Sequence, residues 1–171
     1  MKTILLLVIF AFLIAGCGKK SDKSLMDNAQ KSADQKNYQE AIKNYNDLIK
    51  DYPDSKLIPD ALVNLASLYM SNSDSTLTEY QSYQKAADLF RKVYDKYPNS
   101  DKAPTALFMS GFVLANNLSK YDEATKTYRL FLEKYPNHPL AKSAREELNN
   151  MGISPDDILK SNSKQKKSHA S

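Results

Sequence analysis

The chain repeats one 18-residue pattern three times, and this repetition limits the possible folds more than any other feature. The copies align without a gap and read YQEAIKNYNDLIKDYPDS (38–55), YQKAADLFRKVYDKYPNS (83–100) and YDEATKTYRLFLEKYPNH (121–138). In each copy an Ala is followed by an aromatic residue four positions later, an apolar residue seven later and a Pro twelve later. These positions are Ala41, Tyr45, Leu48 and Pro53; Ala86, Phe90, Val93 and Pro98; and Ala124, Tyr128, Phe131 and Pro136. Offsets of four and seven share one helix face, and Pro cannot continue a helix, so each copy predicts a helix that ends at its Tyr-Pro pair.

A partner helix is predicted before each copy. DALVNLASLYM (60–70) and TALFMSGFVLA (105–115) follow the preceding Tyr-Pro pair at equal distance, and SLMDNAQKSADQ (24–35) precedes the first copy. Each carries a Leu and then a small residue four positions later, which favours close packing on the Ala of the repeat. The sequence therefore predicts an all-α chain of three helix pairs over residues 24–53, 57–98 and 102–136.

The spacing of Ala, aromatic, apolar residue and Pro resembles the tetratricopeptide repeat (TPR) in all three copies. Two features depart from that family: the aromatic residue that opens its first helix is Leu here, and its Gly is kept only at Gly111. The resemblance implies a right-handed solenoid over residues 24–152. A plain bundle of three helix pairs is the alternative.

After the last Tyr-Pro pair, residues 138–151 predict a capping helix with Leu140, Ala144 and Leu148 on its apolar face. Pro139 suits the first helical position and Gly152 a left-handed stop. Residues 153–171 are rich in Ser and Lys and are predicted to be disordered.

The second unit carries seven extra residues around SNSDSTLTEY (71–80), between its two helices. Thr76 and Glu79 have the spacing of a capping box, which would lengthen the second helix of that unit. The alternative is an inserted loop, either functional or merely tolerated.

The N-terminus reads MKTILLLVIFAFLIAGC, with one charge at Lys2 and an apolar run from Ile4 to Ala15. That run is short for a membrane-spanning helix but has the length of a signal-peptide core. Ile14-Ala15-Gly16-Cys17 resembles the bacterial lipobox. The resemblance implies a lipoprotein signal peptide over 1–16, and a diacylglycerol and a further acyl chain (such as palmitate) on Cys17. It also implies a tether over 17–23 and, because Gly18 is not Asp, an outer-membrane destination. A retained N-terminal membrane anchor is the alternative.

No catalytic motif accompanies the repeats. Cys17 is the single cysteine, and the two histidines, His138 and His169, lie far from any residue with which they could form a site. Neither a metalloprotease helix motif nor a Gly-rich phosphate loop nor a Ser-nucleophile elbow occurs. A net charge of +4 without a basic stripe does not indicate nucleic-acid binding. We therefore expect no enzyme activity, no metal, no cofactor beyond the lipid on Cys17, and no small-molecule substrate.

The TPR resemblance implies that the first helix of each unit lines a concave groove that binds a protein or peptide. The groove positions in this chain would be Val63, Ser67, Met70, Phe108, Phe112 and Asn116. Phe108 and Phe112 could form an exposed apolar anchor. They could equally pack against the neighbouring unit or the capping helix.

A lipobox followed by repeats of this form resembles the BamD (ComL) family, the lipoproteins of the outer-membrane β-barrel assembly machinery. This implies a lipid-anchored scaffold that faces the periplasm and binds a cell-envelope protein. The BamD family has about five repeats, whereas three and a cap are found here. Similar repeats occur in the CpoB (YbgF) family of Tol-Pal and cell-wall coordinators and in pilotin lipoproteins, which stay as alternatives. An envelope enzyme accessory or hydrolase is the alternative from another class.

Overall fold

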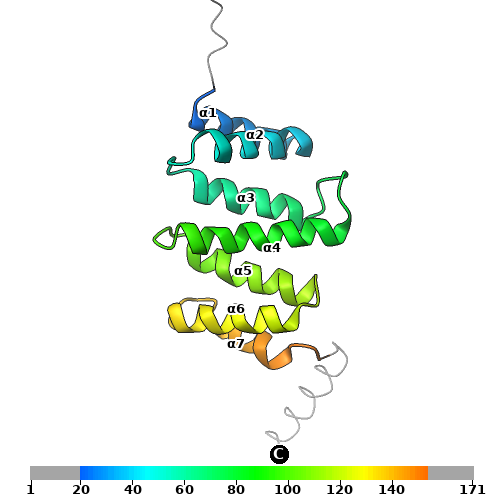
Figure 1. Ribbon diagram of the computed structural model, residues 1–171, viewed down its shortest axis with the longest axis vertical. Helices are drawn as coiled ribbons and strands as arrows, with labels where there is room; N and C mark the ends of the chain where they lie inside the picture. Colours follow the sequence, from blue (N-terminus) through cyan, green and yellow to red (C-terminus); the bar gives the residue numbers. More distant parts are fainter. Residues whose placement is uncertain (1–19, 154–171) are drawn as a thin grey trace, which may run out of the picture.

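The computed structural model describes residues 20–153, which form an all-helical stack (Figure 1). Within this range there are seven helices and no strand. The predicted signal peptide, Cys17 and nearly all of the predicted C-terminal tail lie outside the described residues. The helices are α1 (Asp22–Asp34), α2 (Tyr38–Asp51), α3 (Ile58–Met70), α4 (Glu79–Lys96), α5 (Ala103–Asn116), α6 (Tyr121–Lys134) and α7 (Ala141–Asn150). The all-α stack of helix pairs predicted from the sequence is confirmed.

The repeated residues form the core in the predicted register. Ala41, Ala86 and Ala124 are fully buried, which lets the two helices of each pair approach closely. The aromatic residues four positions later and the apolar residues seven positions later are at most 2% exposed. α5 carries Gly111, where an added Cβ would lie 3.0 Å from the ring of Tyr128 on α6. In the third helix pair, a small residue of the first helix therefore faces a large ring of the second.

The three Tyr-Pro turns have one geometry. The backbone N–H groups of Tyr52, Tyr97 and Tyr135 each donate to the carbonyl four residues earlier, on Leu48, Val93 and Phe131. Each Tyr carbonyl then accepts the N–H three residues later, on Ser55, Ser100 and His138. Because Pro follows each Tyr and cannot donate, the helix ends there and the chain turns into the next unit. All three turns lie along one edge of the stack (Figure 1).

The predicted capping box of the second unit, Thr76 and Glu79, is wrong by two residues. Thr76 does not cap the helix, because its hydroxyl donates to the carboxylate of Asp74 at 2.6 Å. The cap is Thr78, whose side chain accepts the N–H of Gln81 while the Gln81 side chain accepts the N–H of Thr78. α4 therefore begins at Glu79, and the extra residues do lengthen the second helix, as expected.

The two ends of the stack also differ in detail from expectation. Ser21 caps α1 by accepting the N–H of Ser24, so Asp22 and Lys23 belong to the helix and not to the predicted tether. Pro139 lies two residues before α7 instead of at its first position. Gly152 has φ +77°, the left-handed stop that was predicted. No helix within residues 20–153 has the length and apolar character needed to cross a membrane.

Candidate protein-binding groove

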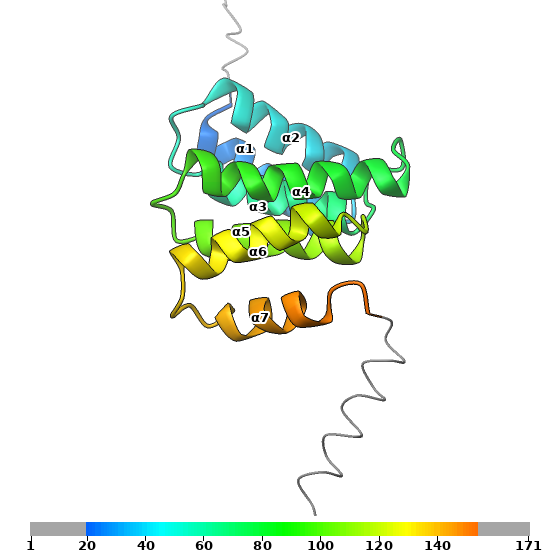
Figure 2. The same ribbon diagram turned by 60° about the horizontal axis from the view of Figure 1, so that its bottom comes forward.

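The helices form two layers, with α3 and α5 behind α4 and α6 in Figure 2. The first helices of the three units, α1, α3 and α5, make up one layer, and the predicted groove residues lie on α3 and α5. The backing layer of α2, α4 and α6 carries the repeated Ala and aromatic residues. The groove is therefore built on a rigid core rather than on loops.

The structure separates the six predicted groove residues into three groups. Ser67 and Asn116 are exposed, while Val63, Met70 and Phe112 are half-buried against the core. Phe108 is only 7% exposed. The predicted groove residues are thus not equally available to a ligand.

The prediction that Phe108 belongs to an exposed apolar anchor is wrong. Its ring centroid lies 5.5 Å from that of Tyr128 and 5.8 Å from that of Phe131, both on α6. Such edge-on and tilted ring pairs are typical of a packed core. The reason is that α5 is apolar on nearly all sides, and nine of its 14 residues are buried. A residue on the outer side of such a helix is still covered by its neighbours.

The first half of the groove contains a polar hollow of about 400 Å³ between α1 and α3. It is lined by Gln30, Ala33, Asp34, Tyr45, Asn64, Ser67 and Leu68. Tyr45 and Asn64 both line it, and burial raises the pKa of the Tyr45 phenol while the Asn64 side chain opposes that rise. The amides of Gln30 and Asn64 can both donate and accept hydrogen bonds, which is what an extended peptide backbone requires.

The second half contains a hollow of about 460 Å³ where α5, the start of α6 and α7 meet. The Asn116 side chain donates to the Glu147 carboxylate at 3.2 Å and so links α5 to the capping helix. Tyr121 and Ile153, two large apolar residues that are 44% and 47% exposed, lie at this hollow. Neither Tyr121 nor Glu147 was among the predicted groove residues. The signal for Tyr121 was available, because it is the first residue of the third repeat.

Tyr128 lies beneath this second half with a buried hydroxyl that has no hydrogen-bond partner among the described residues. Burial, and secondarily the negative charge of Glu147, raise the pKa of Tyr128 far above its usual value. The phenol therefore stays neutral in the folded protein over the physiological pH range.

The charged residues of the described surface are scattered over exposed helix faces. Among residues 20–153, no group of three or more His, Cys, Asp or Glu residues is placed to hold a metal ion. Ion pairs such as Lys43–Asp47 and Arg91–Asp95 join residues four positions apart on exposed helix faces. A hollow of about 690 Å³ lies between the first two Tyr-Pro turns and is lined by residues 53–56, Pro59 and 96–101.

Comparison with known families agrees with this geometry. The family model described as "Tetratricopeptide repeat" matches residues 29–55, 60–100 and 105–138, which together make up more than half of the chain. The protein belongs to the tetratricopeptide-repeat family. Repeats of this kind indicate a protein-interaction scaffold. No curated protein matches the sequence.

Proposed function

We propose that this protein is a lipid-anchored scaffold of the bacterial outer membrane that faces the periplasm and binds a protein partner in its groove. The proposal joins two independent features, the lipobox-like Ile14-Ala15-Gly16-Cys17 and the TPR array. The lipid would hold the protein at the membrane, since two or three acyl chains anchor a soluble domain stably whereas one does not.

The observation that carries the binding role is the open polar hollow between α1 and α3. Ser67 is exposed beside it, and its hydroxyl already donates to the Val63 carbonyl at 2.9 Å. The amides of Gln30 and Asn64 line the same hollow. An extended segment of a partner would lie across α1 and α3 and exchange backbone hydrogen bonds with these amides.

Site-specific photo-crosslinking in living cells tests this role. A photoreactive amino acid at Ser67 should capture one discrete protein, which mass spectrometry then identifies. The matched control is Lys92, an exposed residue of α4 beside a different hollow, between α2 and α4. Equal capture from Lys92 and Ser67, or capture from Lys92 alone, would exclude the groove as the binding surface.

The anchoring role is tested by Cys17→Ser, which removes the thiol that would carry the lipid. The variant should move from the membrane fraction to the soluble periplasmic fraction while its far-ultraviolet circular dichroism stays unchanged. Continued membrane fractionation of Cys17→Ser would contradict lipid anchoring at this residue.

For the pathway, we favour assembly of outer-membrane β-barrel proteins, because the repeats and lipobox resemble the BamD family. The identity of the protein captured from Ser67 decides this point. A component of the barrel-assembly machinery supports the proposal, whereas a Tol-Pal, cell-wall or pilus protein replaces it with one of the related roles.

A further inference from the structure

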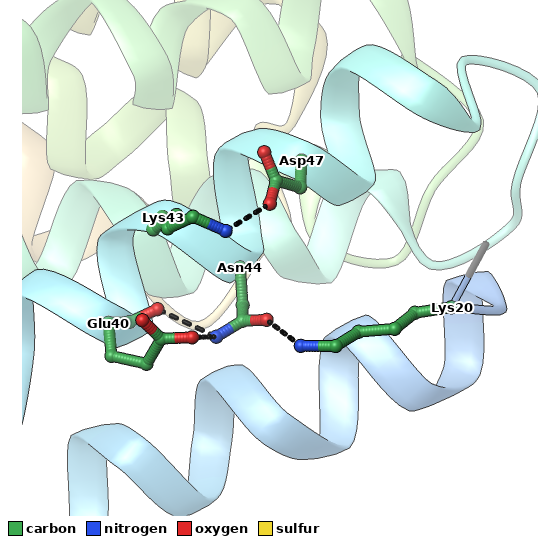
Figure 3. A network of polar contacts seen from close by, with 5 residues as sticks. All are labelled: Lys20, Glu40, Lys43, Asn44 and Asp47. Atoms are coloured by element: carbon green, nitrogen blue, oxygen red, sulfur yellow. Dashed lines mark hydrogen bonds and ion pairs between the residues drawn. The ribbon is translucent and has the colours of Figure 1, made fainter. Parts of the chain in front are cut away.

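The chain is fixed to the fold almost as soon as it leaves Cys17. Lys20, three positions after Cys17, already makes two hydrogen bonds with the fold. The Tyr52 hydroxyl, just after the end of α2, donates to the Lys20 carbonyl. The Lys20 ammonium donates to the side-chain oxygen of Asn44 on α2 at 3.4 Å (Figure 3). Asn44 is itself 1% exposed and donates to the Glu40 carboxylate at 2.8 Å. Lys20 is therefore held to the folded domain by hydrogen bonds.

This short link limits how far the folded domain can stand from a lipid on Cys17. An extended chain spans at most about 3.3–3.6 Å per residue, so the Cα atom of Lys20 lies within about 11 Å of that of Cys17. The headgroup region of a bilayer is roughly 5–8 Å thick on each side of the hydrocarbon core. Lys20 would therefore lie at or near the headgroups.

The surface beside Lys20 is the first Tyr-Pro turn. The Ser55 hydroxyl donates to the Asp22 carboxylate at 2.6 Å, which joins the start of α1 to the turn between α2 and α3. Lys20 and Lys56 are both exposed there. In Figure 1, the start of α1 and this turn lie at the same edge, and the α3–α4 loop lies at the opposite edge.

We propose that the corner formed by residues 20–23 and 52–56 faces the bilayer, with Lys56 against its anionic headgroups. This inference rests on the proposed lipidation of Cys17. Basic residues close to an anionic leaflet are attracted to it within about one Debye length. The 13-residue α1 is about 20 Å long and runs away from this corner, so its far end is held away from the surface.

Quenching of a site-attached fluorophore tests this orientation. The lipidated protein is purified from bacterial membranes and reconstituted in phosphatidylethanolamine–phosphatidylglycerol vesicles containing a lipid with a spin-labelled headgroup. Because the lipid occupies Cys17, an introduced cysteine is the single free thiol. Asp54→Cys reports on the membrane corner, and Gln35→Cys is the matched exposed position at the other end of α1.

The fluorophore at position 54 should be quenched at least twofold more strongly than the one at position 35. Insertion of twelve Gly and Ser residues between Gly18 and Lys19 should bring the two signals close together. Equal quenching in the original protein, or stronger quenching at position 35, overturns the orientation.

The lipid content of the purified protein separates the two proposals. If mass spectrometry finds no lipid on Cys17, the anchoring role and the orientation both fail. If the lipid is present and the vesicles carry the protein, but position 54 is not favoured, the orientation alone fails. Binding in the groove is assayed independently from Ser67.

Discussion

The first and third units place a tyrosine at the same repeat position, and the two hydroxyls have different surroundings. Tyr45 in the first unit lies at the same hollow as the polar side chain of Asn64 on α3, whereas the buried Tyr128 hydroxyl in the third unit has no partner among the described residues. Both rings are at most 2% exposed. The ring is thus needed in both units for packing, and the following helix decides which polar side chain stands near the hydroxyl.

The register of the following helices accounts for this difference. Asn64 stands eleven positions after Pro53 on α3, and the equivalent position on α7, eleven after Pro136, is Glu147. The Glu147 carboxylate accepts a hydrogen bond from Asn116 on α5 at 3.2 Å, and its charge, together with the larger effect of burial, raises the pKa of Tyr128. The capping helix therefore places a carboxylate that is paired with α5 where α3 places an amide, and the Tyr128 hydroxyl has no partner among the described residues.

The largest expected effect concerns Phe108, in the third unit. Truncation of a buried Phe to Ala typically costs 3–5 kcal/mol, so Phe108→Ala should lower the free energy of unfolding by about 3–5 kcal/mol. The equivalent residue of the first unit is Met26, also buried, and Met26→Ala should cost about 2–5 kcal/mol. Urea denaturation measures both.

The half-buried Phe112 provides the control for this prediction, and Phe112→Ala should cost less than Phe108→Ala. A cost below about 0.5 kcal/mol for Phe108→Ala would be typical of a surface position and would restore the exposed-anchor interpretation.

The sequence predicted the fold well because the spacing of residues within the repeat determines which of them are buried. Ala124, Tyr128 and Phe131 are buried as their spacing required, and the Tyr-Pro pairs end their helices as Pro requires. The candidate site was less predictable. Helical spacing tells which side of α5 Phe108 occupies, but not that the rings of α6 cover it.

The caps show the same limit on a smaller scale. Thr76 is followed three residues later by Glu79 and Thr78 by Gln81, so both have the spacing of a capping box. The Asp74 carboxylate binds the Thr76 hydroxyl, and Thr78 caps α4. Such choices depend on contacts between side chains, which a spacing rule does not contain.

The second prediction uses the ionisation of Tyr128. Its pKa is raised in the folded protein, mainly by burial, whereas in the unfolded chain it should lie near the usual ~10. The associated stability is therefore fully present below about pH 10 and is lost as the pH rises above it, because only the unfolded state then releases the proton. One such group lowers the free energy of unfolding by about 1.4 kcal/mol per pH unit.

Urea unfolding between about pH 9 and about pH 11.5 measures this slope. Other groups titrate in the same range, so the informative quantity is the difference between the original protein and Tyr128→Phe. The variant should lose stability less steeply, and identical slopes would contradict a buried, neutral Tyr128.

The smallest effect is also the most direct test of the contrast between the two units. Tyr45→Phe removes the hydroxyl near Asn64 and should cost about 0.5–1.5 kcal/mol, the value of one hydrogen bond between them. Tyr128→Phe removes a buried hydroxyl that has no partner, so it should be neutral or stabilise the protein by up to about 1 kcal/mol. Thermal and urea unfolding at neutral pH should therefore give opposite or clearly unequal shifts for the same chemical change.

A double-mutant cycle attributes the first of these effects to its cause. Once Asn64 is replaced by Leu, Tyr45→Phe should cost less, with a coupling energy of about 0.5–1.5 kcal/mol. Tyr128→Phe should have the same effect in both backgrounds, because Tyr128 and Asn64 belong to different units. Equal costs for the two Tyr→Phe variants would mean that Tyr128 has a hydrogen-bond partner in solution, and the contrast between the units would then lie in packing alone.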